Sequence, residues 1–144
     1  EGTVRTQDPE TRKQVAEYIE QLASGTARAM GGDAKVEYHF GVGPTMNDPA
    51  LIDQISEAVT EVLGADKLLQ VPVPSMGAED FAFYLEKVPG ALFRLGTYDE
   101  TPQSKWALHN PSTLFNETAI PTGVTAMVSS VFKISGADMS VLKH

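Results

Sequence analysis

The stretch whose residues could most readily do chemistry is Ala107-Leu108-His109-Asn110-Pro111, where a histidine follows a Pro/Gln/Ser-rich segment. The proline biases Asn110 toward extended conformations, so we expect His109 to lie on a stiff loop. Imidazole is a common metal ligand, and loops on a rigid scaffold carry many binding and catalytic groups. The same histidine is also compatible with an ordinary, partly exposed surface residue. Its type and position therefore allow metal binding without requiring it.

Two further polar features could contact a ligand. Glu79-Asp80 follows a glycine and opens an expected helix, where a carboxylate could reach a ligand or orient a metal-bound histidine. The helix dipole alone also favours carboxylates at this position. Arg5 could pair with a substrate carboxylate through its planar fork of donors, although an exposed strand arginine is the commoner case.

The histidines of this sequence do not make a complete metal centre. A catalytic zinc ion uses about three protein ligands and a water. No spacing motif ties His39 or His144 to His109, and no paired-histidine motif, phosphate-binding glycine loop or nucleophile elbow is present. Because there is no cysteine, a zinc-like site would use histidine and carboxylates. If His109 is a ligand, we expect its partners to come from other sequence.

Composition narrows the class of protein. The 144 residues, 42% of them hydrophobic, suit one ordinary domain with a sizeable core. A net charge of −8 without a Lys/Arg cluster argues against nucleic acid as a partner. No apolar run approaches the roughly 18 residues of a membrane span. The first residues lack a signal-peptide pattern and look like a strand whose start is missing. The absence of cysteine fits a reducing compartment, and we expect a cytoplasmic location.

Capping residues and helical spacing predict two long helices. Asp8 can cap the first, with proline in its first position, and Gly31 ends it. Asn47 or Asp48 can cap the second, again followed by proline, and Gly64 ends it. Both helices carry an apolar stripe, so we expect both to pack against other elements.

The remaining elements are shorter or less regular. A short helix is expected around 81–88, and Asn116 is expected to cap a last helix that Pro121 should kink or delay. Alternating or β-branched runs predict four strands, at residues 2–6, 35–41, 68–73 and 91–95. The Gly/Pro-rich residues 41–46 break both patterns and predict a joint between two domains.

Several motifs of this chain recur together in one known family. They are Gly2-Thr3-Val4-Arg5-Thr6, Asp8-Pro9-Glu10, Asn47-Asp48-Pro49, Met76-Gly77-Ala78-Glu79-Asp80-Phe81, Leu108-His109-Asn110-Pro111, Phe115-Asn116-Glu117 and Pro121-Thr122-Gly123. In this order they resemble the C-terminal part of metal-dependent amidohydrolases related to hippurate hydrolase, auxin-conjugate hydrolase, N-acetyl-diaminopimelate deacetylase and aminoacylase. The resemblance covers nearly the whole chain, and the Gly-Ala-Glu-Asp-Phe and Leu-His-Asn-Pro blocks in tandem are specific.

The resemblance implies an α/β protein in two parts. Residues 1–44 would be the second half of an α+β lid that often mediates dimerisation. Residues 45–144 would be the C-terminal portion of an α/β catalytic domain of the zinc-peptidase type. The sequence departs from the family pattern at 40–44, Phe-Gly-Val-Gly-Pro, where relatives more often carry an aromatic residue and consecutive prolines. This departure falls on the expected hinge between the two parts.

The resemblance also implies a chemistry. Family members hydrolyse the amide bond of N-acyl amino acids or related small peptide-like conjugates, with two divalent ions (Zn, Mn, Co or Ni) in the intact site. The histidine matching His109 is a metal ligand, and Arg5 matches a lid arginine that contacts the substrate carboxylate in several relatives. Gly77 and Glu79 match a block that lines the active site. The general-base glutamate and the other ligands lie upstream in the family, so we expect the chain alone to be inactive.

Two other interpretations remain open. The chain could be a non-catalytic module that dimerises or binds a partner through the exposed edge of its first strand-helix-strand unit. It could also be a non-enzymatic α/β domain, because likeness at the level of fold does not determine function.

Overall fold

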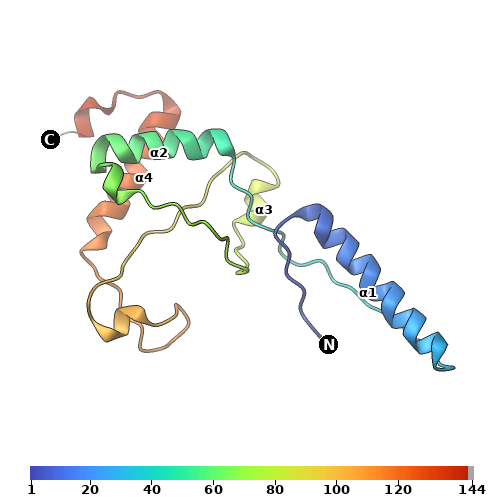
Figure 1. The fold of residues 1–144 in the computed structure, drawn as a ribbon. Helices are drawn as coiled ribbons and strands as arrows, with labels where there is room; N and C mark the ends of the chain where they lie inside the picture. The colour runs from blue at the N-terminus through green and yellow to red at the C-terminus, as the bar shows by residue number, and fades with distance from the viewer. Residues whose placement is uncertain (143–144) are drawn as a thin grey trace. The chain divides into compact units, whose positions relative to one another are not determined.

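The computed structural model describes residues 1–142, which form helices joined by extended segments (Figure 1). The described chain divides into two compact units. Unit 1 consists of Glu1–Asn47 and Val71–Gly90, and unit 2 consists of Asp48–Gln70 and the described residues from Ala91 onward. These units reflect packing, so the functional division expected at 44/45 stays a prediction.

Unit 1 contains the longest helix, α1, at Pro9–Ala29. Asp8 has an extended backbone, and its Oδ1 accepts a hydrogen bond from the Thr11 amide at 2.8 Å, which satisfies one free donor of the first turn. Beyond the last turn, Gly31 adopts a left-handed conformation with φ of 78°. The prediction of a helix that begins after Asp8 and stops at Gly31 is confirmed.

The segment after α1 is extended and has the predicted period of two. Val36 and Tyr38 are half-buried, whereas Lys35, Glu37 and His39 are exposed. This alternation is what an extended backbone produces, because successive side chains point to opposite sides. The pattern therefore holds for Val36 and Tyr38, whereas Phe40, which the same alternation places on their face, is 53% exposed.

The predicted strands are nevertheless wrong for this structure, because the described residues contain no β-strand. A β-strand requires backbone hydrogen bonds to a neighbouring strand, and an alternating pattern of burial does not by itself provide them. The four segments, 2–6, 35–41, 68–73 and 91–95, lie in extended or irregular conformations without such a ladder. In the third of them a proline also removes a donor. Burial alternates as predicted only at Val36 and Tyr38, and all residues of 68–73 are exposed, so the sequence pattern did not reveal which backbones pair.

The short helix of unit 1, α3, spans Ala82–Leu85 and is only one turn long. Its Ala82 is 2% exposed, and the rings of Phe81 and Tyr84 lie 6.1 Å apart. Gly90 permits close approach after the helix, because a methyl group there would lie 2.6 Å from Leu85 Cδ2. The helix predicted around 81–88 is thus present but shorter than expected.

Unit 2 is built on two helices, α2 at Pro49–Leu63 and α4 at Ala119–Ser135, which pack against each other (Figure 1). Ile55, Val59 and Ala126 form the buried centre of this packing, at 8%, 7% and 6% exposure. Ala58 of α2 and Ser129 of α4 are fully buried. Small residues on both helices allow the backbones to approach closely, and the large side chains fill the spaces beside them.

The ends of α2 follow the predicted signals. The Asp48 Oδ1 accepts a hydrogen bond from the Leu51 amide at 3.0 Å, so Asp48 and not Asn47 caps this helix. The Gly64 amide donates to the Thr60 carbonyl at 3.1 Å, and Gly64 has φ of 97°. A glycine is needed here because other residues rarely adopt positive φ. A short 3₁₀ turn, η1 at Ala65–Lys67, follows.

Helix α4 starts late, as predicted from its proline. The Asn116 Oδ1 accepts hydrogen bonds from the Thr118 amide and hydroxyl at 2.9 and 2.7 Å, which closes a turn just ahead of the helix. Pro121 lies in the first turn, where its missing N–H would have had no partner within the helix. The buried Ser129 and Ser130 hydroxyls both donate to the Ala126 carbonyl, at 3.1 and 2.6 Å. Their polar atoms are therefore satisfied inside the packing.

The side of α4 away from the buried centre is apolar and exposed. Its residues recur every three or four positions and are each between 45% and 59% exposed: Ile120, Val124, Met127, Val131 and Ile134. We call this the outer face of α4. A helix that is apolar all round is usually covered on both sides. Among the described helices, none combines the length and hydropathy that crossing a membrane would require.

Candidate functional site

His109 lies in a tight turn formed by residues 107–110. The Asn110 amide donates to the Ala107 carbonyl at 2.9 Å, and the Thr113 amide donates to the Asn110 carbonyl at 3.1 Å, so a second turn follows the first directly. Pro111 occupies the second position of that second turn, which its fixed φ favours. The Thr113 hydroxyl returns to the Ala107 carbonyl at 2.8 Å. The histidine is therefore held on a well-bonded loop, as the sequence predicted.

This double turn belongs to a larger closed loop, residues 97–116, which we call the His109 loop. Its two ends are joined because the Asn116 amide donates to the Thr97 carbonyl at 3.2 Å. Midway, the Leu114 amide donates to the Gln103 carbonyl at 3.4 Å, next to a 3₁₀ turn, η2 at Pro102–Lys105. The loop is thus fixed at its base and across its middle.

A second set of hydrogen bonds orders the first half of the His109 loop. The Asp99 Oδ1 accepts from the Thr101 hydroxyl at 2.5 Å and from the Thr101 amide at 2.8 Å. The Ser104 hydroxyl donates to the Asp99 carbonyl at 2.7 Å. The Thr101 hydroxyl and then the Thr101 amide hold the pKa of the Asp99 carboxyl below its ordinary value. Asp99 is therefore an ionised structural acceptor in this loop.

The imidazole of His109 is exposed and makes no hydrogen bond to another described residue. A metal ion bound there would need further ligands, yet the described residues place no three His, Asp or Glu side chains together for one. His39 is exposed on the extended segment of unit 1, and His144 lies outside the described residues. The described chain can therefore supply one accessible imidazole ligand but not a complete metal centre.

Arg5 of unit 1 contacts the segment that carries Gly77 and Glu79. Its Nη1 donates to the carbonyl of Met76 at 2.7 Å, across 71 residues of sequence. Gln7, two positions along the same extended segment, places its Nε2 3.5 Å from the Met76 sulfur. Arginine has five N–H donors, so one bond to Met76 leaves others for a carboxylate. The structure thus joins Arg5 to the residue that directly precedes Gly77.

The Glu79 carboxylate is exposed and precedes the one-turn helix α3. The Glu79 carbonyl accepts from the Ala82 amide at 3.0 Å, whereas its carboxylate makes no hydrogen bond or ion pair to another described residue. A helix dipole is the sum of aligned peptide dipoles, so a single turn attracts a carboxylate only weakly. This short helix weakens the purely structural interpretation of Glu79.

Gly77 has open space around it. A methyl group there would meet only the Ser75 hydroxyl, at 3.5 Å, so the position tolerates close approach of another group. Arg5, Gly77 and Glu79 all belong to unit 1, whereas His109 belongs to unit 2. Gln7 was not predicted, although its spacing of two from Arg5 on an extended segment was a usable signal.

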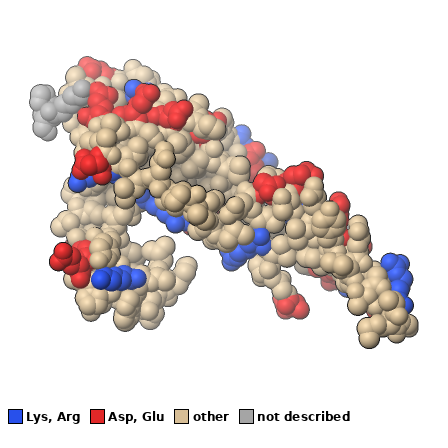
Figure 2. Space-filling model, in the orientation of Figure 1, with Lys and Arg blue, Asp and Glu red and all other residues tan. Residues whose placement is uncertain are grey.

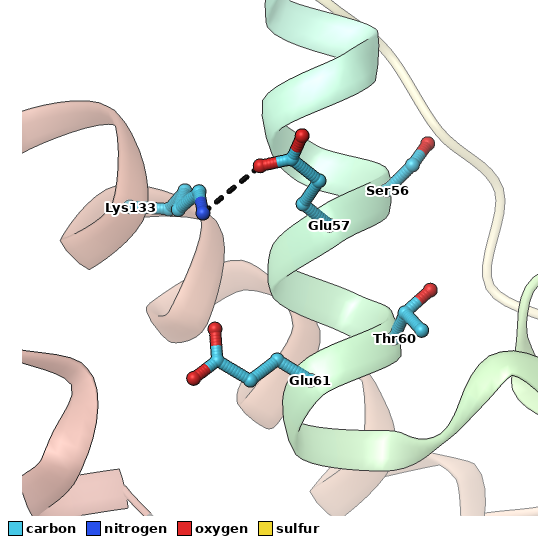
Figure 3. Close-up of a pocket in the computed structure, with 5 residues that line it drawn as sticks. All are labelled: Ser56, Glu57, Thr60, Glu61 and Lys133. Atoms are coloured by element: carbon cyan, nitrogen blue, oxygen red, sulfur yellow. Dashed lines mark ion pairs between the residues drawn. The ribbon is translucent and has the colours of Figure 1, made fainter.

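Unit 2 also has a shallow polar hollow between α2 and α4 (Figure 3). Glu57 and Glu61 point toward α4, and the Glu57 Oε2 lies 2.9 Å from the Nζ of Lys133 (Figure 3). This contact raises the pKa of Lys133, first through the hydrogen bond and then through the charge of Glu57. Acidic side chains gather on the surface over α2 (Figure 2). The hollow is lined by Ser56, Glu57, Thr60, Glu61 and Lys133 and contains no histidine to activate a hydroxyl, so its ion pair is best explained as a link between the two helices.

Comparisons with known proteins identify the family. The model of "Peptidase family M20/M25/M40" matches residues 3–133. A protein named "Probable hydrolase sll0100", from Synechocystis sp., is 42% identical over 126 residues, which is 88% of this chain and 32% of that protein. An N-acetyl-L-cysteine deacetylase from Bacillus subtilis is 37% identical over 122 residues, 83% of this chain and 27% of that protein. An N-acetyldiaminopimelate deacetylase from Geobacillus sp. is 30% identical over 131 residues, 91% of this chain and 33% of that protein.

These alignments set the scale of the relationship. The chain spans between 27% and 33% of the length of these three relatives. No solved structure matches it significantly. The family model covers the Arg5 segment, the Gly77–Glu79 block and the His109 loop in one continuous match. The resemblance to amidohydrolases is therefore confirmed, and the chain belongs to the peptidase family M20/M25/M40.

Proposed function

We propose that this chain is the C-terminal portion of a metal-dependent amidohydrolase that cleaves the amide bond of N-acyl amino acids or related small conjugates. The observation that carries the proposal is the family match over 3–133, together with relatives named as deacetylases of an N-acetylated amino acid and of N-acetyldiaminopimelate. The family generally uses divalent metal ions. Two such ions, of Zn, Mn, Co or Ni, would be present in the intact site.

His109 is the residue that we assign to metal binding. The His109 loop supports this role, because an exposed imidazole on a turn fixed by hydrogen bonds has little freedom to lose on coordination. The described residues do not provide the remaining ligands. These would come from the part of the relatives' length that this chain does not span. When bound, divalent ions lower the pKa of a coordinated water and so supply a nucleophile near neutral pH.

Arg5, Gly77 and Glu79 are assigned to substrate binding. The Arg5 guanidinium is fixed by one bond to Met76 and keeps further donors for a substrate carboxylate. Gly77 leaves room for a ligand, and the Glu79 carboxylate is free of protein partners among the described residues. Of these three, Arg5 would favour acidic or zwitterionic N-acyl amino acids over uncharged amides.

We further propose the two-part organisation that the family suggests, with residues 1–44 in an α+β lid and 45–144 in an α/β catalytic domain. Extended segments without strand partners support this proposal, because they could pair once the rest of a family-length protein is present. The exposed outer face of α4 supports it as well. The absence of cysteine supports a cytoplasmic location.

The proposal predicts that the 144-residue chain alone neither binds stoichiometric metal nor hydrolyses N-acyl amino acids. Metal analysis after dialysis and a ninhydrin assay for released amino acid would test this. In a family-length protein that contains the chain, His109→Ala should lower metal content and abolish hydrolysis. His39→Ala is the matched control, because His39 is also exposed but lies on the other unit. Equal activity and metal content in wild type and His109→Ala would refute the assignment.

A homodimer that forms through residues 1–44 is the partner that we propose. Two features support this dimer, because unpaired extended backbone and exposed apolar side chains favour association. One is the extended segment 33–40. The other is a set of exposed apolar side chains on α1 and at its C-cap: Tyr18, Leu22 and Met30. A purely non-catalytic dimerisation module would keep this association and lack hydrolysis in the family-length protein. Light scattering coupled to size exclusion distinguishes the cases, and a strict monomer at high concentration would rule out the dimer.

A further inference from the structure

The segment 40–43, Phe40-Gly41-Val42-Gly43, has no regular secondary structure. Its two glycines give the backbone wide conformational freedom. A segment with this composition does not order itself, because fixing each residue costs conformational entropy. A defined path therefore depends on contacts from elsewhere in unit 1.

Arg12 provides such contacts to three consecutive residues. Its Nη2 donates to the carbonyl of Gly41 at 2.5 Å and to the carbonyl of Val42 at 3.2 Å. The same guanidinium lies over the ring of Phe40, 5.1 Å from the ring centroid. Both the donor edge and the flat face of one planar group are thus used, which an ammonium group could not reproduce.

The anchor of Arg12 is a regular element. Arg12 lies in the first turn of α1, its amide donates to the Asp8 carbonyl at 3.2 Å, and its side chain is half-buried. Gly43, at the end of the segment, lies close to charges of both signs. A methyl group there would lie 3.6 Å from Glu86 Oε1 and 3.8 Å from Arg12 Nη1. The segment is therefore tied to a capped helix by a side chain with restricted freedom.

We propose that Arg12 is a positioning residue that holds 40–43 in one conformation and so fixes the backbone path that precedes Pro44. The consequence for catalysis rests on the function proposed above, in which this segment is the hinge between lid and catalytic parts. A guanidinium from α1 thus supplies the stiffness that the glycines of this segment do not. Arg12 acts through the backbone and does not touch substrate.

The local part of the proposal is tested on the 144-residue chain by ¹⁵N relaxation. Backbone order parameters at 41–43 should be near 0.85 in the wild type and below about 0.6 in Arg12→Met. Arg28→Met is the matched control, since Arg28 lies in the last turn of the same helix, and it should leave these values unchanged. Arg12→Lys should not restore order. Wild-type order in Arg12→Met or full rescue by lysine would overturn the proposal.

A loss of α1 in Arg12→Met would appear in the circular dichroism spectrum, and Phe40→Leu then serves as the second variant. Phe40→Leu removes the ring under the guanidinium but leaves both hydrogen bonds possible. The backbone order parameters at 41–43 should therefore fall below the wild-type values but stay above about 0.6. An unchanged value in Phe40→Leu, with Arg12→Met unfolded, would overturn the proposal as well.

The catalytic part is tested in a family-length protein with an N-acyl amino acid. A loosened hinge lowers the fraction of molecules competent to bind, so KM should rise on the order of fivefold in Arg12→Met while kcat changes little. Unchanged KM despite disorder at 41–43 would overturn the role in the reaction. Failure of the wild type to hydrolyse the substrate would instead refute the proposed function and leave the relaxation result to decide the local role.

Discussion

Replacing Ile55 with alanine should lower the stability of unit 2 by about 3 kcal/mol. Ile55 is 8% exposed and lies at the buried centre formed with Val59 and Ala126. The substitution removes three carbon atoms, which at about 0.8 kcal/mol each accounts for roughly 2.4 kcal/mol of lost burial. The two helices limit collapse around the vacated space, so a cavity contribution is added, within the roughly 2–5 kcal/mol found for such changes.

The single tryptophan of the chain, Trp106, lies in unit 2 and reports its unfolding by fluorescence. Urea titrations at constant temperature would give the free energy of unfolding for wild type and variant. Ile120→Ala is the matched control, because it makes the same chemical change on the outer face of α4, where Ile120 is 59% exposed. The control should cost less than about 0.5 kcal/mol.

Equal costs for Ile55→Ala and Ile120→Ala would refute the assignment of a buried face to α2 and an exposed outer face to α4. The same pair also tests the larger proposal. If the outer face is covered in a family-length protein, Ile120→Ala should there cost more than about 1.5 kcal/mol. A cost that stays small in the longer protein would show that the outer face of α4 remains exposed.

Three further predictions concern helix ends and charges. The pKa of Asp8 lies below its ordinary value of 3.8 because it accepts hydrogen bonds from the Thr11 amide and side chain. The stabilisation from the ionised Asp8 carboxylate is therefore present above that value and is lost as pH falls through the lowered pKa. The chemical shift of the Thr11 amide should follow this titration in the wild type and should not in Asp8→Asn. A titration of the Thr11 amide that persists in Asp8→Asn would contradict the assignment. The pKa of Lys133 is raised above 10.5 by Glu57, so this stabilisation is present below 10.5 and lost as pH rises through the raised pKa. Glu57→Gln should return the Lys133 pKa toward 10.5 in side-chain NMR, and an unchanged pKa would show that the contact does not persist in solution. Gly64→Ala should destabilise unit 2 by about 1 kcal/mol in the fluorescence assay, because the residue has φ of 97°; a neutral result would mean that the turn relaxes.

The helices could be predicted from the sequence because their signals are local. Asp8 and Asp48 each precede a proline, and Gly31 and Gly64 supply the positive φ that ends or follows each helix. The late start of α4 followed from one proline. The extent of α3 was overestimated, since four apolar residues at helical spacing do not prevent a helix from ending after one turn.

The strands and most site contacts could not be predicted because they depend on distant residues. The alternation in 35–41 matched the burial of Val36 and Tyr38, but pairing needs a neighbouring strand that periodicity does not reveal. By contrast, the turn that carries His109 could be predicted, because it is encoded by nearby residues such as Pro111. The bond from Arg5 to Met76 spans 71 residues and has no local signal.

The backbone hydrogen bond between Asn116 and Thr97 makes the His109 loop a unit that could be moved as a whole into another protein. Its turns, its crossing bond at Gln103 and its histidine are all specified between those two residues. Such a loop could be exchanged between homologous proteins at these two residues with little effect on the helices that flank it. Sequence diversity in a variant library could therefore be concentrated between residues 98 and 115, with His109 kept constant along with the helices.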